Sequence, residues 1–422
     1  VALGKIGLPL AVQFASKGHE VVGADVNKRV VDQVNEGVEP FPGEYDLGPR
    51  LAEAVGAGRL RATTDTTAAV RECEAVVIVV PLFVDAAGVP DFAWMDSATE
   101  AVAAGLRPGT LVSYETTLPV GTTRERWAPM LEAGSGLTAG KDFHLVFSPE
   151  RVLTGRVFAD LRRYPKLVGG IGAASALAGV RFYEAVLDFD ARDDLPRANG
   201  VWDLGSAEAS EMAKLAETTY RDVNIGLANQ FARFADRQGL DVVKVIEACN
   251  SQPYSHIHRP GIAVGGHCIP IYPQMYLWND PEATVVREAR RANAAMPAYA
   301  VEVLAAAYGD LEGANVLVLG AAYRGGVKET AFSGVFPLVA SLREHGAVPL
   351  VSDPMYSEAE LEAEGLTPHR GEAVTAAVIQ ADHAEYRTLA PADLPEVKVL
   401  LDGRRITDPT AWQGRHHITL GG

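Results

Sequence analysis

Cysteine is scarce in this chain of 422 residues, which contains only Cys73, Cys249 and Cys268. Three scattered cysteines exclude a disulfide framework and a cysteine-rich zinc site, and we expect no metal centre. Low cysteine usage of this kind is typical of proteins in a reducing compartment. We therefore expect a cytoplasmic protein.

Long apolar runs are also missing from the sequence. The most apolar run, residues 75–84, has roughly half of the ~20 residues that a transmembrane helix needs, and Pro81 interrupts it. We expect no membrane partner. The sequence opens at Val1 within an expected strand-to-helix turn, so we expect further residues before it.

Positive charge is in deficit, because 38 Lys and Arg residues stand against 54 Asp and Glu residues and give a formal net charge of -16 at pH 7. This excess of negative charge disfavours nucleic acid as a partner. An anionic small substrate would need a local cluster of basic residues. The length and the 48% of hydrophobic residues allow two or three domains, each with its own core.

Residues 1–25 and 316–353 follow one plan, in which an apolar strand, a glycine turn and a helix lead to a second strand that ends in an acidic residue. Asp25 closes the first of these segments and Asp353 closes the second. This plan predicts two Rossmann-like, doubly wound α/β domains.

Residues 206–236 contain one glycine, Gly226, and no proline, and their apolar residues recur at helical spacing. The pattern predicts a long helix that Ser206 caps and Gly239 ends. At 1.5 Å per residue the helix is about 45 Å long, which is more than one small domain needs. We interpret it as a central helix that joins the two domains and contributes to a homodimer interface. The alternative is a buried spine within one chain.

Gly4 and Gly7 form a turn where backbone N–H groups and a helix N-terminus can bind a pyrophosphate. Asp25 follows about 20 residues later, where an acidic residue binds a ribose 2′-hydroxyl, and this favours NAD over NADP. Because Ala2 replaces the first glycine of the usual pattern, a generic tight turn is the alternative.

Paired glycines precede a cysteine in the segment 265–270 and let the backbone approach a ligand while the thiol stays accessible. Cys268 is therefore the candidate nucleophile. Cys73 and Cys249 lie in apolar or helical stretches typical of packing residues. His267 could act as a base, but adjacent side chains on an extended backbone point apart, so we favour a structural or substrate-contact role.

A nucleophilic cysteine and a nicotinamide cofactor together indicate oxidation of an alcohol to an aldehyde, a thiohemiacetal and a thioester, followed by hydrolysis. Over nearly its whole length the chain resembles the UDP-glucose/GDP-mannose dehydrogenase family. The matching segments are residues 4–9 with Asp25, 116–122, 148–152, 211–215, 265–270, 320–325 and 402–405.

The resemblance implies an NAD-binding Rossmann domain at residues 1–195, a central helical dimerisation domain at 200–300 and a C-terminal UDP-sugar-binding Rossmann-like domain at 310–422. It implies that Cys268 is the nucleophile, that Lys214 stabilises an alkoxide or oxyanion, and that Glu150 and Thr117 handle protons or the hydrolytic water. Without the resemblance, Lys214 would be interpreted as a solvated lysine on a helix surface and Glu150 as a helix-capping carboxylate.

The resemblance also implies two sets of binding residues. The NAD contacts are Gly4, Lys5, Ile6, Gly7, Asp25, Pro81 and Thr116. The sugar-nucleotide contacts are Arg151, Arg259, Gly265, His267, Tyr323, Arg324 and Arg404. In the family, Arg259 can reach the substrate of a neighbouring subunit, and the guanidinium groups can bind phosphate oxygens. Surface ion pairs are the alternative role for these arginines.

The sequence departs from the family pattern at Thr218 and Tyr272, where an asparagine and an aspartate are usual. Thr218 can still donate one hydrogen bond, but Tyr272, with a reference pKa of about 10, cannot serve as a carboxylate base. Glu329 and Ala331 also replace a usual aspartate and arginine. The exchanges at Thr218 and Tyr272 make thioester hydrolysis the affected step, and those at Glu329 and Ala331 bear on the substrate contacts.

The Gly-His-Cys-Ile-Pro segment resembles family members that act on N-acetylhexosamine nucleotides. The sequence thus predicts an NAD-dependent nucleotide-sugar 6-dehydrogenase that converts the C6 hydroxyl of a UDP-N-acetylhexosamine to a carboxylate. Three alternatives are a UDP-glucose dehydrogenase, an enzyme that stops early or oxidises another carbon because of Tyr272 and Thr218, and a non-catalytic nucleotide-sugar-binding protein.

Overall fold

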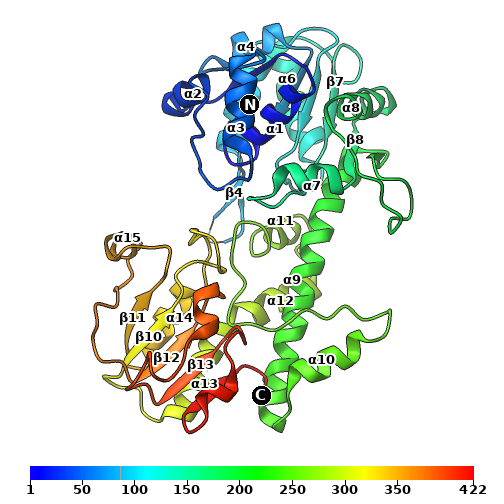
Figure 1. Ribbon diagram of the computed structural model, residues 1–422. Helices are drawn as coiled ribbons and strands as arrows, with labels where there is room; N and C mark the ends of the chain where they lie inside the picture. The colour runs from blue at the N-terminus through cyan, green and yellow to red at the C-terminus, as the bar shows by residue number, and fades with distance from the viewer. Residues whose placement is uncertain (86) are drawn as a thin grey trace. The chain divides into compact units, whose positions relative to one another are not determined.

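The computed structural model describes residues 1–85 and 87–422 and divides the chain into two compact units, Val1–Glu217 and Thr218–Gly422 (Figure 1). Each unit has a predominantly parallel sheet with helices packed on it, which confirms the predicted α/β class with two Rossmann-like domains. Among the described residues, no helix is long and apolar enough to cross a membrane.

The first unit contains a five-stranded sheet in the order β3-β6-β7-β8-β9, a parallel pair β1-β2 and a short antiparallel hairpin β4-β5. The strands are β1 (Val21–Ala24), β2 (Leu60–Thr63), β3 (Ala75–Ile78), β4 (Phe83–Val84), β5 (Pro90–Asp91), β6 (Leu111–Tyr114), β7 (His144–Phe147), β8 (Lys166–Gly170) and β9 (Val201–Asp203). The helices are α1 (Gly7–Ser16), α2 (Lys28–Asn35), α3 (Leu47–Gly56), α4 (Thr66–Glu72), α5 (Ala93–Ala103), the π-helix η1 (Thr122–Trp127), α6 (Ala128–Ser135), α7 (Val157–Arg163) and α8 (Ala173–Val186).

One strand of the larger sheet runs against its neighbour. β8 is antiparallel to β7, with Phe147 opposite Gly169, whereas β3, β6 and β7 are parallel to one another. The first residue of β8, Lys166, therefore lies at the edge of the sheet where β6 and β7 end. Glu115 follows β6 and Glu150 follows β7, so the reversal brings a lysine toward two glutamates.

The long helix α9 (Ala207–Gln238) begins in the first unit and continues into the second. The Ser206 hydroxyl accepts a hydrogen bond from the Ala209 amide at 3.1 Å, and Gly239 follows the last helical residue. Both ends are those that the sequence predicts, because a serine satisfies a free amide of the first turn and a glycine ends a helix easily.

The second unit is built on a five-stranded, fully parallel sheet in the order β11-β10-β12-β13-β14. Its strands are β10 (Asn315–Leu319), β11 (Val348–Ser352), β12 (Ala376–Ile379), β13 (Val399–Asp402) and β14 (His416–Thr419). Its other helices are α10 (Val242–Asn250), α11 (Tyr272–Asn279), α12 (Thr284–Ala294), α13 (Met296–Tyr308), α14 (Val335–Glu344), α15 (Glu358–Ala363), and the 3₁₀ turns η2 (Ala384–Thr388) and η3 (Pro409–Trp412).

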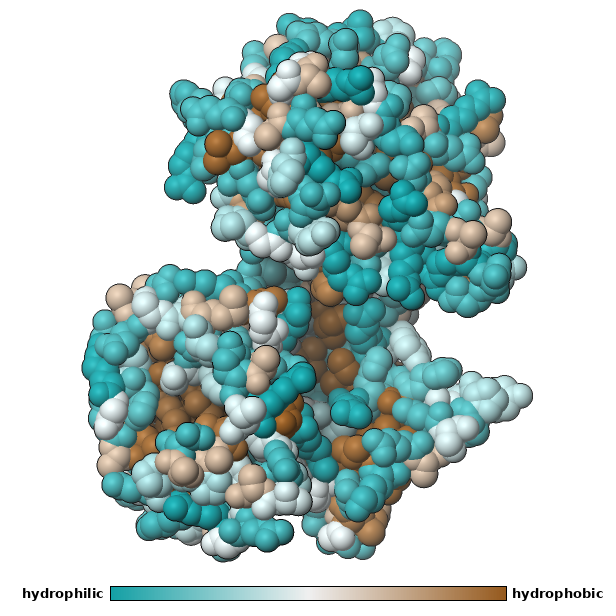
Figure 2. Space-filling view, in the orientation of Figure 1, coloured by the Kyte–Doolittle hydropathy of each residue, from teal (hydrophilic) through white to brown (hydrophobic). Residues whose placement is uncertain are grey.

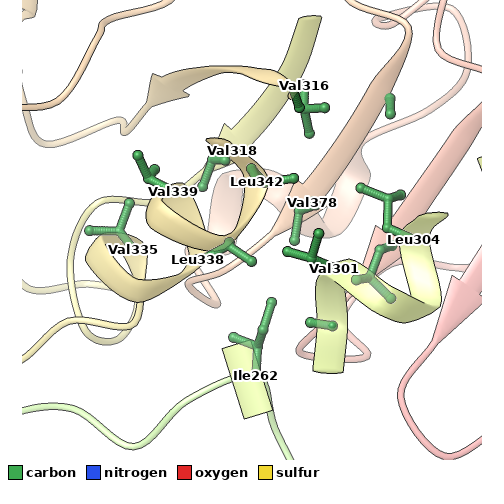
Figure 3. Packing of buried hydrophobic residues seen from close by; sticks show 14 of the residues in the cluster. Ile262, Val301, Leu304, Val316, Val318, Val335, Leu338, Val339, Leu342 and Val378 are labelled. Carbon is green, nitrogen blue, oxygen red and sulfur yellow. The ribbon is translucent and has the colours of Figure 1, made fainter. Parts of the chain in front are cut away.

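The core of the second unit lies between this sheet and helices α13 and α14 (Figure 3). Val316, Val318 and Val378 come from the sheet and are fully buried, and Leu304 and Leu338 of the helices pack on the same cluster. Strands that are buried on both faces read as continuous apolar runs, and this is why residues 316–319 are recognisable in the sequence.

Candidate active site

The turn before α1 has the geometry of a phosphate-binding loop. A Cβ atom on Gly7 would lie 1.9 Å from the Ala2 carbonyl oxygen, so only glycine fits where α1 begins. A Cβ on Gly4 would meet nothing within 4 Å, so the surface above Gly4 is open. Ala2, which replaces the first glycine of the usual pattern, adopts a left-handed φ of 68°. The turn thus keeps the glycine-like conformation without the glycine.

Asp25 directly follows β1 and its carboxylate is fixed by two amides. Oδ2 accepts a hydrogen bond from the Leu3 amide at 2.7 Å, and Oδ1 accepts one from the Asn27 amide at 2.8 Å. Asp25 is half-buried beside the turn that carries Gly4. An open turn at a helix N-terminus with a carboxylate at the end of the next strand is the arrangement that holds a dinucleotide.

The other two predicted NAD contacts lie on neighbouring segments. The Thr116 hydroxyl donates a 2.6 Å hydrogen bond to the carbonyl of Val80, the residue before Pro81. The loops after β3 and β6 are therefore joined at this point. Lys5 is exposed and Ile6 is half-buried on the turn before α1.

Glu150 is held from three sides. The carboxylate accepts a 2.7 Å hydrogen bond from the Arg151 amide and forms an ion pair with the Lys166 ammonium at 3.0 Å. The Lys214 ammonium donates a 2.6 Å hydrogen bond to the backbone carbonyl of Glu150. Burial alone would raise the pKa of Glu150, but the Lys166 ammonium reverses this effect and holds that pKa below its ordinary value. The carboxylate is therefore ionised and oriented.

Lys214 and two other predicted site residues have little contact with solvent, and Arg151 is half-buried. Lys214 is only 9% exposed, so it is not a solvated lysine on a helix surface. Thr117 and Thr218 are also buried. The Arg151 guanidinium makes a two-point ion pair with Glu217, at 3.0 and 3.2 Å. Its role in substrate binding stays a prediction, since this guanidinium already has a carboxylate partner.

Two buried glutamates near these residues were missed by sequence reasoning. Glu115, after β6, accepts a 2.7 Å hydrogen bond from the Lys166 ammonium. Glu211 on α9 accepts hydrogen bonds from the Gly121 amide at 2.6 Å and from the amide and hydroxyl of Thr123 at 2.9 and 2.6 Å. Burial raises the pKa of Glu211 to about 7 despite these three donors. The spacing of Glu211 and Lys214 on one motif was a signal that both belong to one constellation.

In the second unit, the glycine pair before Cys268 packs tightly on the segment after β10. A Cβ on Gly265 would lie 2.7 Å from the Tyr323 Cβ and 2.8 Å from the Phe332 carbonyl oxygen, so only glycine fits. The Gly266 amide also donates a 3.0 Å hydrogen bond to the Ala331 carbonyl. These contacts fix the loop that leads to Cys268.

Cys268 is exposed, whereas Cys73 and Cys249 are half-buried. Its Sγ lies 3.8 Å from the hydroxyl of Tyr272, the first residue of α11, and its backbone carbonyl accepts the Tyr272 amide at 3.0 Å. His267 points to Glu329, with 3.6 Å between Nε2 and Oε2. The thiol is therefore accessible, and the tyrosine hydroxyl lies beside it.

The carboxyl ends of the strands in the second unit carry the basic residues. β10 lies between β11 and β12, so successive strands are added on opposite sides of β10 although all of them are parallel, and ligands of such sheets bind in the crevice at this switch point. Arg404 follows β13, and its Nε donates a 2.6 Å hydrogen bond to the Gln380 carbonyl after β12. Arg324 follows β10 and its Nε lies 3.2 Å from the Tyr323 hydroxyl. Arg259 is exposed and 3.8 Å from Glu247.

Asp353 and Asp25 follow equivalent strands, but their carboxylates have different hydrogen-bond partners. Its Oδ2 accepts hydrogen bonds from the Ala321 and Ala322 amides at 2.7 and 3.1 Å and lies 3.1 Å from His383 Nε2. The Asp353 carboxylate therefore ties the Gly320 turn to its own unit. The two repeats share a plan but present different groups to a ligand.

Three domain descriptions of one family match the chain in order. Residues 1–187 match the NAD binding domain of the UDP-glucose/GDP-mannose dehydrogenase family, residues 208–295 its central domain and residues 317–409 its UDP binding domain. The first match confirms NAD as the cofactor, and the third supports a nucleotide-sugar substrate.

Similar proteins cover nearly the full chain. The UDP-N-acetyl-D-mannosamine dehydrogenase of Pyrococcus horikoshii is 36% identical over 419 residues, which are 96% of this chain and 94% of the relative. The NDP-N-acetyl-D-galactosaminuronic acid dehydrogenase of Ralstonia nicotianae is 32% identical, with 96% and 94% covered.

Solved structures are similar over the same extent. The UDP-D-ManNAc dehydrogenase of Pyrococcus horikoshii has a TM-score of 0.88 at 33% identity and covers 100% of this chain and 98% of its own. The UDP-glucose dehydrogenase of Pyrobaculum islandicum has a TM-score of 0.87 at 26% identity, with 100% and 96% covered. The chain therefore belongs to the UDP-glucose/GDP-mannose dehydrogenase family and is an NAD-dependent nucleotide-sugar dehydrogenase.

Proposed function

We propose that this chain oxidises the C6 hydroxyl of UDP-N-acetyl-D-mannosamine, or of a closely similar UDP-N-acetylhexosamine, to a carboxylate. The observation that carries the proposal is the exposed thiol of Cys268 on a glycine loop that packs against Tyr323. The substrate class is supported by the relative from Pyrococcus horikoshii, which is named for UDP-N-acetyl-D-mannosamine. We place the reaction in the cytoplasm on the scarcity of cysteine.

NAD, when bound, accepts a hydride from the substrate carbon in each of the two oxidations. The residues proposed to hold it are Gly4, Lys5, Ile6, Gly7, Asp25, Pro81 and Thr116. The open surface above Gly4 and the fixed carboxylate of Asp25 support this assignment. Asp25 would accept hydrogen bonds from ribose hydroxyls, which a 2′-phosphate could not offer.

The remaining steps belong to side chains of the protein. In the first oxidation the C6 hydroxyl gives its proton to Glu150 through Thr117 and its carbon loses a hydride, which leaves the aldehyde. The Lys214 ammonium stabilises the negative charge that develops on the reacting oxygen. The Cys268 thiolate adds to the aldehyde carbon and forms a thiohemiacetal, which is oxidised to a thioester. Glu150 takes a proton from a water molecule as that water adds to the thioester carbon. The C–S bond then breaks, and the products are the carboxylate and the Cys268 thiolate.

Hydroxyl groups and arginines complete the proposed site. Thr117 and Thr218 donate hydrogen bonds to the water or the oxyanion. Arg324 and Arg404 bind the diphosphate, because guanidinium groups pair with phosphate oxygens at two points. The other proposed sugar-nucleotide contacts are Arg151, Gly265, His267, Tyr323 and, from a neighbouring subunit, Arg259.

The contact between Tyr272 and Cys268 favours a second candidate function, an enzyme that does not complete the oxidation. Tyr272 stands where the family usually has an aspartate, and its hydroxyl lies 3.8 Å from Cys268 Sγ. A phenol near a thiolate can donate a hydrogen bond to it but cannot deprotonate water near neutral pH. If hydrolysis is impaired by this exchange, the reaction would stop at the thioester or the aldehyde.

We further propose that the protein is a homodimer and that residues 1–195, 200–300 and 310–422 act as NAD-binding, dimerisation and UDP-sugar-binding domains. Leu227, Phe231 and Phe234 on α9 are 45%, 38% and 53% exposed, at spacings that place them on one face of the helix. Figure 2 shows apolar surface at the lower end of α9, next to α10. Sedimentation of Phe234→Glu should give a lighter species than the wild type, and Trp94→Glu should not.

A substrate panel tests the proposed function. The purified protein is incubated with NAD and UDP-N-acetylmannosamine, UDP-N-acetylglucosamine, UDP-N-acetylgalactosamine or UDP-glucose, and products are identified by mass. We expect the highest kcat/KM with a UDP-N-acetylhexosamine and a uronate as product. Preference for UDP-glucose, an aldehyde or ketone product, or binding without NADH would each contradict the proposal and favour the corresponding alternative.

A further inference from the structure

A buried ion cluster lies behind Glu150 in the first unit. Lys166 Nζ is 3.0 Å from Glu150 Oε2 and 2.7 Å from Glu115 Oε2, so a single ammonium bridges two carboxylates. The side chains of Lys166, Glu115 and Glu150 are 4%, 0% and 11% exposed, and so Glu150 is the member in contact with solvent. The Lys166 ammonium also lies 4.8 Å from the centre of the Tyr183 ring.

The inner carboxylate, Glu115, has a hydrogen-bond partner on each of its two oxygens. Tyr183 on α8 donates its hydroxyl proton to Glu115 Oε1 at 2.6 Å, and the Ser113 hydroxyl lies 2.7 Å from the same Tyr183 oxygen. Ser113, Tyr183 and Glu115 thus form a chain that ends at Lys166. Such a chain fixes the Lys166 ammonium on the side away from Glu150.

The charges of this cluster do not balance when every group is ionised. Two carboxylates and one ammonium leave one buried negative charge, which is costly in a medium of low polarity. Burial raises the pKa of Glu115 to about 7 even though Lys166 opposes the effect. The pKa of Glu150 shifts the other way, because Lys166 and the Arg151 amide outweigh its burial. As the pH falls, the cluster therefore takes its proton at Glu115 first.

The geometry also distinguishes this cluster from an ordinary surface ion pair. The charged groups around Glu150 in this unit are Lys166 on β8, Glu115 after β6, Lys214 on α9 and Arg151 beside it. Lys214 contacts the backbone carbonyl of Glu150, and Arg151 uses its guanidinium on Glu217. Lys166 places its ammonium directly on the Glu150 carboxylate, at 3.0 Å from Oε2.

We propose that Lys166 and Glu115 are positioning residues for Glu150: Lys166 keeps its carboxylate ionised and fixed, and Glu115 holds the Lys166 ammonium from the opposite side. The inference rests on the proposed function, in which Glu150 takes a proton from water. Neither residue touches the reacting atoms. A base that stays ionised behind a buried cation can accept a proton without the cluster rearranging.

The two residues should affect the Glu150 carboxyl differently. Removal of the cation in Lys166→Met should raise the pKa of Glu150, and Lys166→Arg should restore it. Because Glu115 already carries its proton when Glu150 titrates, the uncharged Glu115→Gln should leave the Glu150 midpoint nearly in place. A merely structural cluster would be loosened by either loss and would give similar shifts in both variants.

The test is a carboxyl ¹³C NMR titration of full-length protein labelled at glutamate Cδ, with the Glu150→Gln and Glu115→Gln spectra used to assign the two signals. We expect the Glu150 midpoint to rise by about one pH unit or more in Lys166→Met, which is a tenfold change in proton affinity. The double variant Lys166→Met/Glu115→Gln removes both charges of the pair. The Glu150 midpoint can be measured in it if Lys166→Met alone does not fold. An unchanged Glu150 midpoint in folded Lys166→Met or in the double variant, or an equal rise in Glu115→Gln, would overturn the proposal.

The pH dependence of acid formation separates this inference from the proposed function. The proposed function fails if Glu150→Gln forms the acid at the wild-type rate. The inference alone fails if Glu150→Gln loses acid formation but Lys166→Met leaves both the Glu150 midpoint and the acidic limb of the pH profile in place. We expect the acidic limb to move to higher pH in Lys166→Met and to return in Lys166→Arg.

Discussion

Lys214 donates a 2.6 Å hydrogen bond to the backbone carbonyl of Glu150. This contact joins the long helix α9 to the segment that follows β7, and it brings two residues of the proposed mechanism together inside one unit. Because the bond uses the backbone of Glu150, the carboxylate remains held by Lys166 and by the Arg151 amide. Substitution of either side chain should therefore leave the other in place.

Cys268→Ala should retain nucleotide-sugar binding and lose acid formation, since the thiol is exposed and the proposed thioester cannot form without it. Calorimetry measures the binding, and product mass measures the acid. Cys249→Ala is the matched control, because this half-buried cysteine has no role in the proposed reaction. Full acid production by Cys268→Ala would exclude the covalent route.

Arg404→Ala should raise KM at least about tenfold and change kcat much less, because it removes binding that is remote from the reacting carbon. Arg404 is held at the switch point of the second sheet by the Gln380 carbonyl. Steady-state kinetics measure both constants. Arg387→Ala, which changes an exposed arginine of the same unit, should leave them unchanged. An unaltered KM would place Arg404 outside the site.

Glu211→Ala should lower the free energy of unfolding by about 3 kcal/mol or more, because three buried donors on Gly121 and Thr123 lose their acceptor. Glu208→Ala is the control on the same helix. Its partner Arg124 is exposed, so the loss should be less than about 1 kcal/mol. Urea unfolding measures both values, and equal losses would contradict this role of Glu211.

Glu115 should make the stability of the wild type depend on pH. Its pKa of about 7 lies above the ordinary value near 4.5, so between these two values the unfolded chain releases a proton that the folded chain keeps. Stability from this group is thus greatest below about pH 4.5 and falls as the pH rises toward about 7.

Glu115→Gln cannot titrate, so its stability relative to the wild type should rise by roughly 3 kcal/mol across that window. Urea unfolding at about pH 5 and about pH 7 measures the change. Glu36→Gln, at an exposed glutamate, should show no such trend. A constant difference between Glu115→Gln and the wild type would contradict the assignment.

The sequence predicts the architecture well because its strongest signals are local. The helical spacing of residues 206–236 and the residues at its ends predict α9 almost to its bounds, Ala207–Gln238. The repeated strand-turn-helix plan predicts both Rossmann-like sheets. Asp25 and Asp353 show the limit of this reasoning, because both carboxylates accept hydrogen bonds from loop amides but Asp353 is also paired with the buried His383.

The ion cluster behind Glu150 could not be predicted in the same way. Lys166 and Glu115 are 51 residues apart in sequence, and neither belongs to a sequence pattern that indicates an ion pair. They meet because β8 runs antiparallel to β7, which places the start of β8 at the edge where β6 ends. Strand direction is set by tertiary packing, so no local sequence pattern predicts this contact.

The amount of NADH formed per nucleotide sugar consumed tests the central claim most directly. A complete oxidation of C6 through the Cys268 thioester removes two hydrides for each carboxylate released. We predict two NADH per UDP-N-acetylhexosamine consumed, with a uronate as the product. One NADH per sugar, with an aldehyde, a ketone or a thioester retained on Cys268, would contradict the account.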